Sequence, residues 1–88
     1  METTTLTIIN KTGLHTRPGK NFVQLAKQFE AAITLEKEGS TYNAKSLLKI
    51  MKAGICQGDE IRLSADGSDE KEAITALKSY IENLDPEA

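Results

Sequence analysis

The sequence predicts an α+β fold, an open-faced two-layer sandwich in which three helices cover one face of a four-stranded sheet, in the order β-α-β-β-α-β-α. Apolar side chains alternate in four short segments and recur at helical spacing in three others, with turn-forming residues between them. The chain has 88 residues, of which 39% are hydrophobic and 27% charged. This is the size and composition of one small core, so we expect residues 1–88 to form a single domain.

The first two elements differ in the period of their apolar residues. Leu6 and Ile8 alternate with threonines, which favour extended backbone, and this predicts a strand over residues 3–9. From Pro18 the period becomes helical, because proline is tolerated in a first helical turn. A helix over residues 17–28 would place four apolar side chains on one face: Phe22, Leu25, Ala26 and Phe29.

A hairpin and a short helix follow. A strand over residues 33–37, a turn at 38–39 and a return strand over 40–43 have the alternation and turn chemistry of a hairpin. Ser46 is a side chain that caps helix N-termini, and Gly54 is suited to ending a helix. The short helix between them would carry Leu47, Ile50 and Met51 at helical spacing.

The last third of the chain predicts a strand and a helix. Residues 61–65 alternate between two turns that contain Gly and Asp. Asp69, with Glu72 three residues later, predicts a capping pair at the start of a helix that ends before Pro86. This helix would bury Ile74, Leu77, Tyr80, Ile81 and Leu84.

Charge is distributed unevenly along the chain. Residues 1–58 carry a net charge of +4 and residues 59–88 carry −6, which together give the overall −2. No acidic residue stands between Thr3 and Phe29 or between Gly39 and Gly58, although both stretches contain cations. Two basic segments of this kind favour an anionic ligand or an acidic protein partner.

Composition also excludes several functions. No apolar stretch approaches the roughly 20 residues of a membrane span, and no leader-like segment is evident, so we expect a soluble, cytoplasmic protein. One Cys and one His cannot form an internal disulfide or a zinc cluster, and we expect neither metal nor cofactor. Aromatic residues make up only 5%, without basic neighbours in alternation, which argues against nucleic acid as a partner.

The single histidine, His15, stands where the first predicted strand meets the first predicted helix. His15 or Thr16 can act as the N-cap, so unpaired backbone N–H groups and the positive end of the helix dipole would face a group on the ring. Arg17 adds a planar guanidinium that suits phosphate oxygens. Neutral imidazole, with an ordinary pKa of about 6.5, is also a competent nucleophile. The residues therefore predict an anion site, although a lone histidine in a polar loop would fit the same local pattern.

Two motifs resemble one known family. Gly13-Leu14-His15-Thr16-Arg17-Pro18 is similar to the active-site signature of HPr, the histidine-containing phosphocarrier of the bacterial phosphoenolpyruvate-dependent sugar phosphotransferase system. Asn43-Ala44-Lys45-Ser46-Leu47-Leu48 is similar to the regulatory serine segment of that family. The resemblance extends over nearly the whole chain and implies four antiparallel strands under three helices.

The resemblance also implies roles for particular residues. His15 would accept a phosphoryl group on Nδ1 from phosphorylated Enzyme I and pass it to Enzyme IIA, while Arg17 and the backbone amides of Thr16 and Arg17 hold the phosphate. Ser46 would be the site that HPr kinase/phosphorylase modifies. A docking face for these partners would contain Lys20, Lys27, Lys45, Leu47, Leu48, Lys49, Met51 and Lys52, in a monomeric protein that is not itself an enzyme. Gly19 stands where the family commonly has Ala, which would loosen the first helical turn by up to ~1 kcal/mol.

Three other functions fit parts of the sequence. A nitrogen-regulatory or signalling member of the same family would use the same His15. A small phosphohydrolase resembling acylphosphatase would need an arginine and an asparagine to orient water, for which Asn10 and Asn21 are candidates. A regulator that only binds its partner would depend on Ser46 and not on His15.

Overall fold

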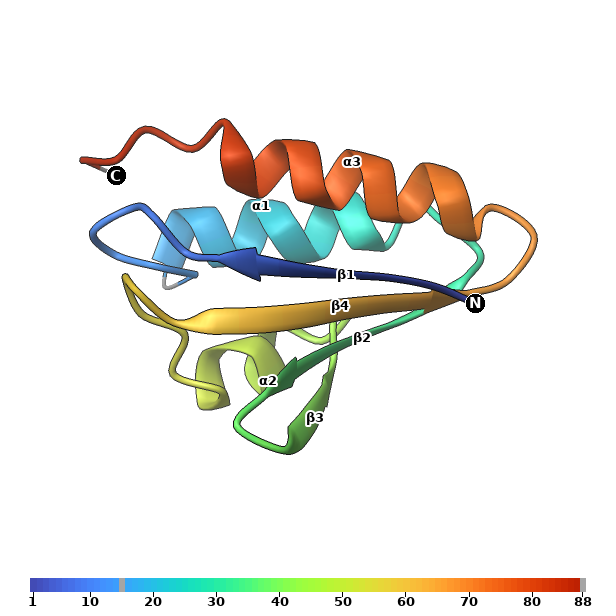
Figure 1. Cartoon of the computed structure of the whole chain (residues 1–88), viewed down its shortest axis with the longest axis horizontal. Coiled ribbons are helices and arrows are strands. Elements are labelled where there is room, and N and C mark those ends of the chain that lie inside the picture. Colours follow the sequence, from blue (N-terminus) through green and yellow to red (C-terminus); the bar gives the residue numbers. More distant parts are fainter. Residues whose placement is uncertain (15, 88) are drawn as a thin grey trace.

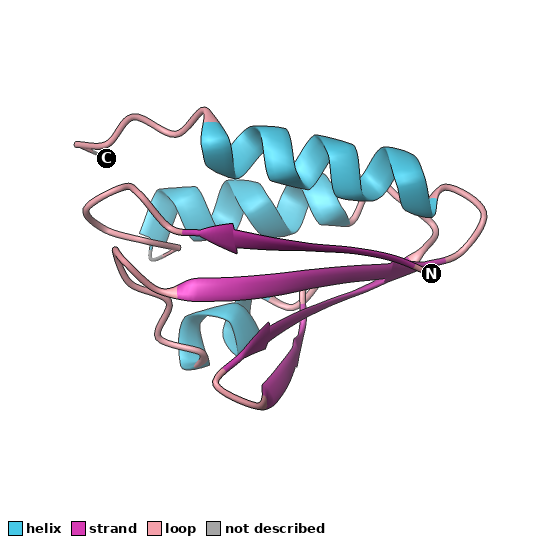
Figure 2. Ribbon diagram, in the orientation of Figure 1, coloured by secondary structure: helices cyan, strands magenta, loops and turns pink. Residues whose placement is uncertain are grey.

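The computed structural model describes residues 1–14 and 16–87, and the predicted order of elements is confirmed (Figures 1 and 2). The elements are β1 (Glu2–Thr7), α1 (Thr16–Ala26), β2 (Ala32–Lys37), β3 (Ser40–Asn43), α2 (Leu47–Lys52), β4 (Glu60–Asp66) and α3 (Glu70–Glu82). The strands form one sheet in the order β1-β4-β2-β3, and all three pairings are antiparallel.

The two faces of the sheet differ in character because side chains alternate along each strand. On β4, Ile61, Leu63 and Ala65 are buried, whereas Glu60 and Arg62 are exposed. The helices cover the buried face: α3 contacts β1 and β4, α2 contacts β3, and α1 contacts both other helices. None of the described helices or strands forms a second layer on the opposite face, so the predicted open-faced sandwich is confirmed.

The core forms between the helices and the covered face of the sheet. The apolar faces predicted for the first and last helices are buried in it: Phe22, Ala26, Leu77 and Ile81 are at most 1% exposed. Leu25, Phe29, Tyr80 and Leu84 are partly buried and pack around this cluster. The spacing of apolar residues therefore identified the buried faces of both long helices correctly.

The first helix is shorter than its apolar period suggests. Its α-helical range ends at Ala26 rather than at residue 28. The N–H groups of Gln28 and Phe29 donate to the carbonyls of Leu25 and Ala26, three residues back, at 3.1 and 3.3 Å. The last turn is thus tightened into 3₁₀-type hydrogen bonds, which are common at helix ends.

The predicted capping pair at the start of α3 is wrong. Asp69 is the N-cap residue, but its carboxylate makes no cap hydrogen bond within α3. It accepts hydrogen bonds from the N–H groups of Glu30 at 2.8 Å and Ala31 at 2.9 Å, in the segment between α1 and β2. Tertiary contacts have taken the side chain from its local partner, because two backbone donors near one carboxylate bind it more strongly than one.

Asp69 therefore gives the stability of the fold a defined pH dependence. The N–H groups of Glu30 and Ala31 lower the pKa of the Asp69 carboxyl below its ordinary value of 3.8. Its contribution is complete above pH about 4 and is lost as the pH falls through the lowered pKa. We expect Asp69→Asn to lower the urea midpoint of unfolding near neutral pH, and the difference from wild type to shrink in strong acid. Glu72→Gln, at the other position of the predicted pair, should leave the midpoint unchanged.

Candidate functional site

The candidate site begins with the segment between β1 and α1, whose residues 8–14 we call the 8–14 loop. Leu14 closes this loop and is 1% exposed, so the chain is anchored in the core immediately before position 15. Thr16 begins α1 immediately after it. His15 itself lies outside the described residues. The elements that would position its ring are therefore the buried end of the loop on one side and a helix start on the other.

A tight turn shapes the 8–14 loop. The side-chain amide of Asn10, a fully buried residue, donates to the carbonyl of Gly13 at 2.8 Å, and the N–H of Gly13 donates to the carbonyl of Asn10 at 3.2 Å. Gly13 has φ of 62°, a conformation that other residues rarely adopt. Asn10 is thus committed to the loop, which argues against the water-orienting role considered for it.

Residues 53–59, which connect α2 to β4, contact this loop, and we call them the 53–59 segment. The N–H of Leu14 donates to the carbonyl of Ile55 at 3.2 Å. A Cβ on Gly13 would lie 2.1 Å from that same carbonyl oxygen, so the two backbones touch. At the other end of the loop, Ile8 and the 53–59 segment exchange two hydrogen bonds, from Gly58 N–H at 2.8 Å and to the Asp59 carbonyl at 2.9 Å.

The first turn of α1 is held closely against the loop. A Cβ at Gly19 would lie 2.1 Å from the carbonyl oxygen of Leu14. Glycine therefore does more here than loosen the helix, because alanine would require that carbonyl to move. On the other side, the hydroxyl of Tyr80 in α3 donates to the carbonyl of Pro18 at 3.0 Å.

Removing the Tyr80 hydroxyl tests how far α3 supports this turn. Burial raises the pKa of the Tyr80 phenol, with a smaller opposing effect from Asn21. A hydrogen bond to a backbone carbonyl contributes about 1 kcal/mol to stability. We expect Tyr80→Phe to lower the free energy of unfolding by about that amount, measured by urea denaturation. Tyr42→Phe, on β3, is the matched control and should cost less.

The anion-binding groups predicted beside position 15 belong to α1. Thr16 and Arg17 are in its first turn, where backbone N–H groups have no acceptor within the helix. The side chain of Arg17 is exposed. A helix start with an accessible guanidinium can hold an anion from more than one direction.

Ser46 occupies the N-cap of α2, as predicted. Its Oγ accepts a hydrogen bond from the N–H of Lys49 at 3.3 Å, and its carbonyl accepts the first helical bond from Ile50 at 3.0 Å. The side chain is partly exposed. A capping role alone would explain this serine, which lies close in sequence to two lysines, Lys45 and Lys49.

The residues proposed for docking are not all equally accessible. Leu48 is 66% and Met51 44% exposed, whereas Leu47 packs partly against the core. Lys45 is tethered, since its ammonium donates to the carbonyl of Phe29 at 2.6 Å. The other cations are exposed on α1, just after its end or on α2, and the two helices contact each other: Arg17, Lys20, Lys27, Lys49 and Lys52.

The end of the chain also reaches the 8–14 loop. The N–H of Lys11 donates to the carbonyl of Pro86 at 3.0 Å, and the Lys11 ammonium lies 2.7 Å from a carboxylate oxygen of Glu87. Figure 1 shows this tail at the same end of the molecule as the loop, opposite the amino end. The candidate site is thus bordered by the 53–59 segment, by α3 through Tyr80, and by residues 86–87.

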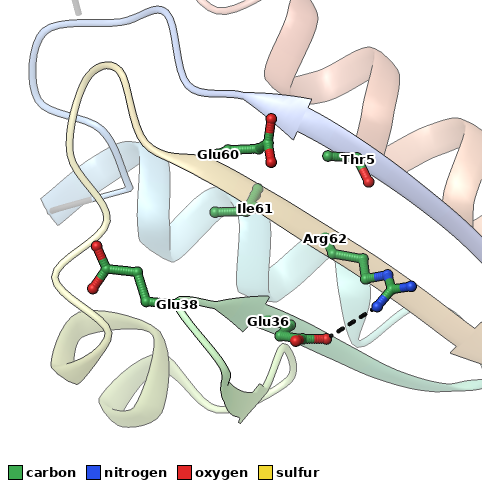
Figure 3. Close-up of a pocket in the computed structure, with 6 residues that line it drawn as sticks. All are labelled: Thr5, Glu36, Glu38, Glu60, Ile61 and Arg62. Atoms are coloured by element: carbon green, nitrogen blue, oxygen red, sulfur yellow. Dashed lines mark hydrogen bonds and ion pairs between the residues drawn. The ribbon is translucent and has the colours of Figure 1, made fainter.

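A hollow of about 250 Å³ lies on the uncovered face of the sheet, away from these residues (Figure 3). Its lining is mostly charged: Thr5, Glu36, Glu38, Glu60, Ile61 and Arg62. Arg62 and Glu36 form an exposed ion pair at 3.5 Å across β4 and β2. The hollow includes none of the predicted site residues. Among the described residues, no group of three or more His, Cys, Asp or Glu side chains is placed to hold a metal ion.

The fold and the site define a small α+β sandwich that presents a loop, a helix start and a basic, partly apolar face. The sequence model described as the PTS HPr component phosphorylation site matches residues 2–83. The phosphocarrier protein HPr of Buchnera aphidicola subsp. Acyrthosiphon pisum (strain APS) is 48% identical over 73 residues, covering 83% of this chain and 86% of that protein. The HPr-like protein Crh of Bacillus subtilis (strain 168) is 43% identical over 72 residues, covering 82% and 85%.

Solved structures agree with this match. The crystal structure of HPr from Thermoanaerobacter tengcongensis superposes with a TM-score of 0.92 at 50% identity, covering 93% of this chain and 92% of that one. The chain therefore belongs to the HPr family of phosphocarrier proteins. Within residues 1–14 and 16–87, none of the helices has the length and apolar character of a membrane span.

Proposed function

We propose that the chain is a phosphoryl carrier of the phosphoenolpyruvate-dependent sugar phosphotransferase system. His15 accepts a phosphoryl group on Nδ1 from phosphorylated Enzyme I and passes it to the Enzyme IIA domain of a sugar permease. The chain is a protein substrate of both partners and works as a cytoplasmic monomer without a cofactor. The supporting observation is that position 15 joins the buried Leu14 to the first turn of α1, in a chain that matches the family over residues 2–83.

The main contribution of the protein to the transfer is to position and stabilise the phosphoryl group. The imidazole nitrogen supplies the electron pair of the new N–P bond, and the donor keeps the pair of the bond that breaks. The first-turn amides of α1 and the Arg17 guanidinium stabilise the phosphoryl oxygens. Because a phosphoryl group on imidazole is labile, the protein needs only to hold it and present it to the next acceptor.

The exposed part of α2 is the proposed docking face. Leu48 and Met51 are the large apolar side chains that α2 exposes. The same helix exposes Lys49 and Lys52, and the contacting α1 exposes further cations, which would attract acidic surfaces of Enzyme I and Enzyme IIA. Such charges mainly raise the rate of association.

Labelled phosphoenolpyruvate with Enzyme I provides the test. Wild type should acquire one acid-labile phosphoryl group per chain, and His15→Ala should acquire none. Arg17→Ala should be phosphorylated more slowly. Label that stays on His15→Ala, or catalytic hydrolysis of acyl phosphate by wild type alone, would contradict the proposal. Phosphorylation only by a nitrogen-type Enzyme I would assign the chain to the nitrogen-regulatory branch.

Regulation through Ser46 is part of the proposal, with HPr kinase/phosphorylase as the modifying enzyme. A phosphate on Oγ would fit the helix start, yet it would place negative charge within the basic docking face. We expect Ser46→Asp to slow phosphorylation of His15 by Enzyme I with little change in melting temperature, because aspartate also caps helices. Ser46→Ala should do the reverse: it should lose about 1 kcal/mol of stability and keep the wild-type rate. Equal transfer rates in the two variants would refute the charge mechanism.

A further inference from the structure

A shielded ion pair anchors the 53–59 segment to β2. The Lys37 ammonium, at the end of β2, is 2.9 Å from a carboxylate oxygen of Asp59, just before β4. The side chains are 15% and 26% exposed, whereas those of Arg62 and Glu36, the pair that also joins β4 to β2, are 56% and 41% exposed. Shielding from water reduces screening, so the Lys37–Asp59 pair is the stronger restraint.

Lys37 also holds the start of the 53–59 segment. Its ammonium donates to the carbonyls of Ala53 at 3.2 Å and Gly54 at 2.8 Å, where α2 ends. Cations are favourable at the carbonyl end of a helix, and these bonds join that end to β2. The hydrogen bond to Asp59 raises the pKa of Lys37, so the ammonium stays charged at neutral pH.

Asp59 closes the same segment on itself. The carboxylate oxygen that pairs with Lys37 also accepts the N–H of Cys56 at 2.7 Å, and the N–H of Asp59 donates back to the Cys56 carbonyl at 3.0 Å. The hydrogen bonds from the Cys56 N–H and from the Lys37 ammonium both lower the pKa of the Asp59 carboxyl, and the one from Cys56 has the larger effect. Lys37 therefore holds the start of the 53–59 segment and Asp59 holds its end, and the two side chains pair with each other.

Hydrogen bonds connect the 53–59 segment to the 8–14 loop. Leu14, the last described residue before position 15, bonds to Ile55, and Ile8 bonds to both Gly58 and Asp59. The side-chain amide of Gln57 adds a hydrogen bond to the Ile9 carbonyl at 3.0 Å. A shift of the segment would therefore move both ends of the loop.

We propose that Lys37 and Asp59 are positioning residues for phosphoryl transfer, and that their ion pair sets the placement of His15 through the 53–59 segment and the 8–14 loop. This inference rests on the proposed function of His15. Among the described residues, the side chains of Lys37 and Asp59 bond to each other and to backbone groups of the 53–59 segment. Their effect is on orientation, where a displacement of about 1 Å at a reacting group can cost ~100-fold in rate.

The test uses Lys37→Met and Asp59→Asn, with Arg62→Met and Glu36→Gln as matched controls from the exposed pair. Asp59→Asn keeps an oxygen for the Cys56 N–H and is the milder change. Two phosphoryl donors are compared: Enzyme I, which must dock, and phosphoramidate, a small donor that needs no docking. We expect both test variants to react about tenfold more slowly with either donor. In the Enzyme I reaction, kcat should be lowered and the KM of Enzyme I for this chain should be kept. The controls should react like wild type.

Two spectroscopic measurements separate positioning from a loss of stability. The chain has one histidine, so its ring signals in NMR report on His15 alone. They should shift in the test variants, and the Leu14 amide should exchange faster with solvent, under conditions in which every variant is folded. Partial recovery of the rate in Lys37→Arg, which restores the charge, would support the proposal further.

The outcomes distinguish this inference from the proposed function. If wild type accepts phosphate and the test variants match it within about twofold, with unchanged ring signals, the positioning role is refuted and the carrier function stands. If wild type accepts no phosphate, the carrier function fails. The ring signals then decide whether the ion pair still positions His15.

Discussion

Gly13→Ala is expected to produce the largest loss of phosphoryl acceptance outside His15 itself. The φ of 62° at this position costs a side-chain-bearing residue about 1–2 kcal/mol. The new Cβ would also collide with the Ile55 carbonyl oxygen, 2.1 Å away. The loop must therefore move away from the 53–59 segment, and we expect phosphorylation by Enzyme I to fall by about 100-fold.

Gly39→Ala is a close control for this prediction. Gly39 also has a positive φ, of 83°, but nothing lies within 4 Å of an added Cβ. It should lose only the conformational cost, about 1–2 kcal/mol in urea denaturation, and retain the wild-type rate of phosphorylation. If the two alanine variants have equal rates, contact between the loop and the segment is not what positions the site.

Phe22→Ala is expected to have the largest effect on stability. Phe22 is fully buried in α1, and its ring centroid lies 6.5 Å from that of Tyr80 in α3. Deleting a buried phenyl ring costs about 3–5 kcal/mol, a large part of the 5–15 kcal/mol that stabilises a typical domain. We expect a melting temperature lower by about 12 °C or more, measured by circular dichroism.

Phe29→Ala provides the comparison on the same apolar face. Phe29 lies beyond the end of α1 and is only partly buried, so its removal leaves a smaller cavity. It should lower the melting temperature clearly less than Phe22→Ala does. An equal loss would mean that burial in α1 is not what determines the contribution of these rings.

The fold could be predicted from sequence largely because its signals are local. Apolar period identified Phe22 and Leu77 as core residues, and the capping preference of serine identified Ser46 as a cap. Asp69 was placed at the right helix but with the wrong partners, since Glu30 and Ala31 are distant in sequence. Local motifs describe the residues within one turn and give no information on which backbone donors folding brings nearby.

The candidate site was likewise predictable where its signals are local and unpredictable where they depend on residues distant in sequence. The motif around His15 and Arg17 could be recognised from consecutive residues, and Gly13 could be predicted as a turn residue. The supports of the 8–14 loop could not be read, because Lys37 and Asp59 stand 22 positions apart and look like ordinary surface charges. A lysine in a strand and an aspartate after a glycine give no signal of their pairing until the topology places β2 beside β4.

The contact between Lys11 and residues 86–87 has a practical consequence for reporter fusions. A fluorescent protein or affinity tag added at the carboxyl end would emerge beside the 8–14 loop, where it could obstruct an approaching partner. One added at the amino end would emerge from the opposite end of the sheet. Labelling studies of this carrier should therefore use amino-terminal fusions.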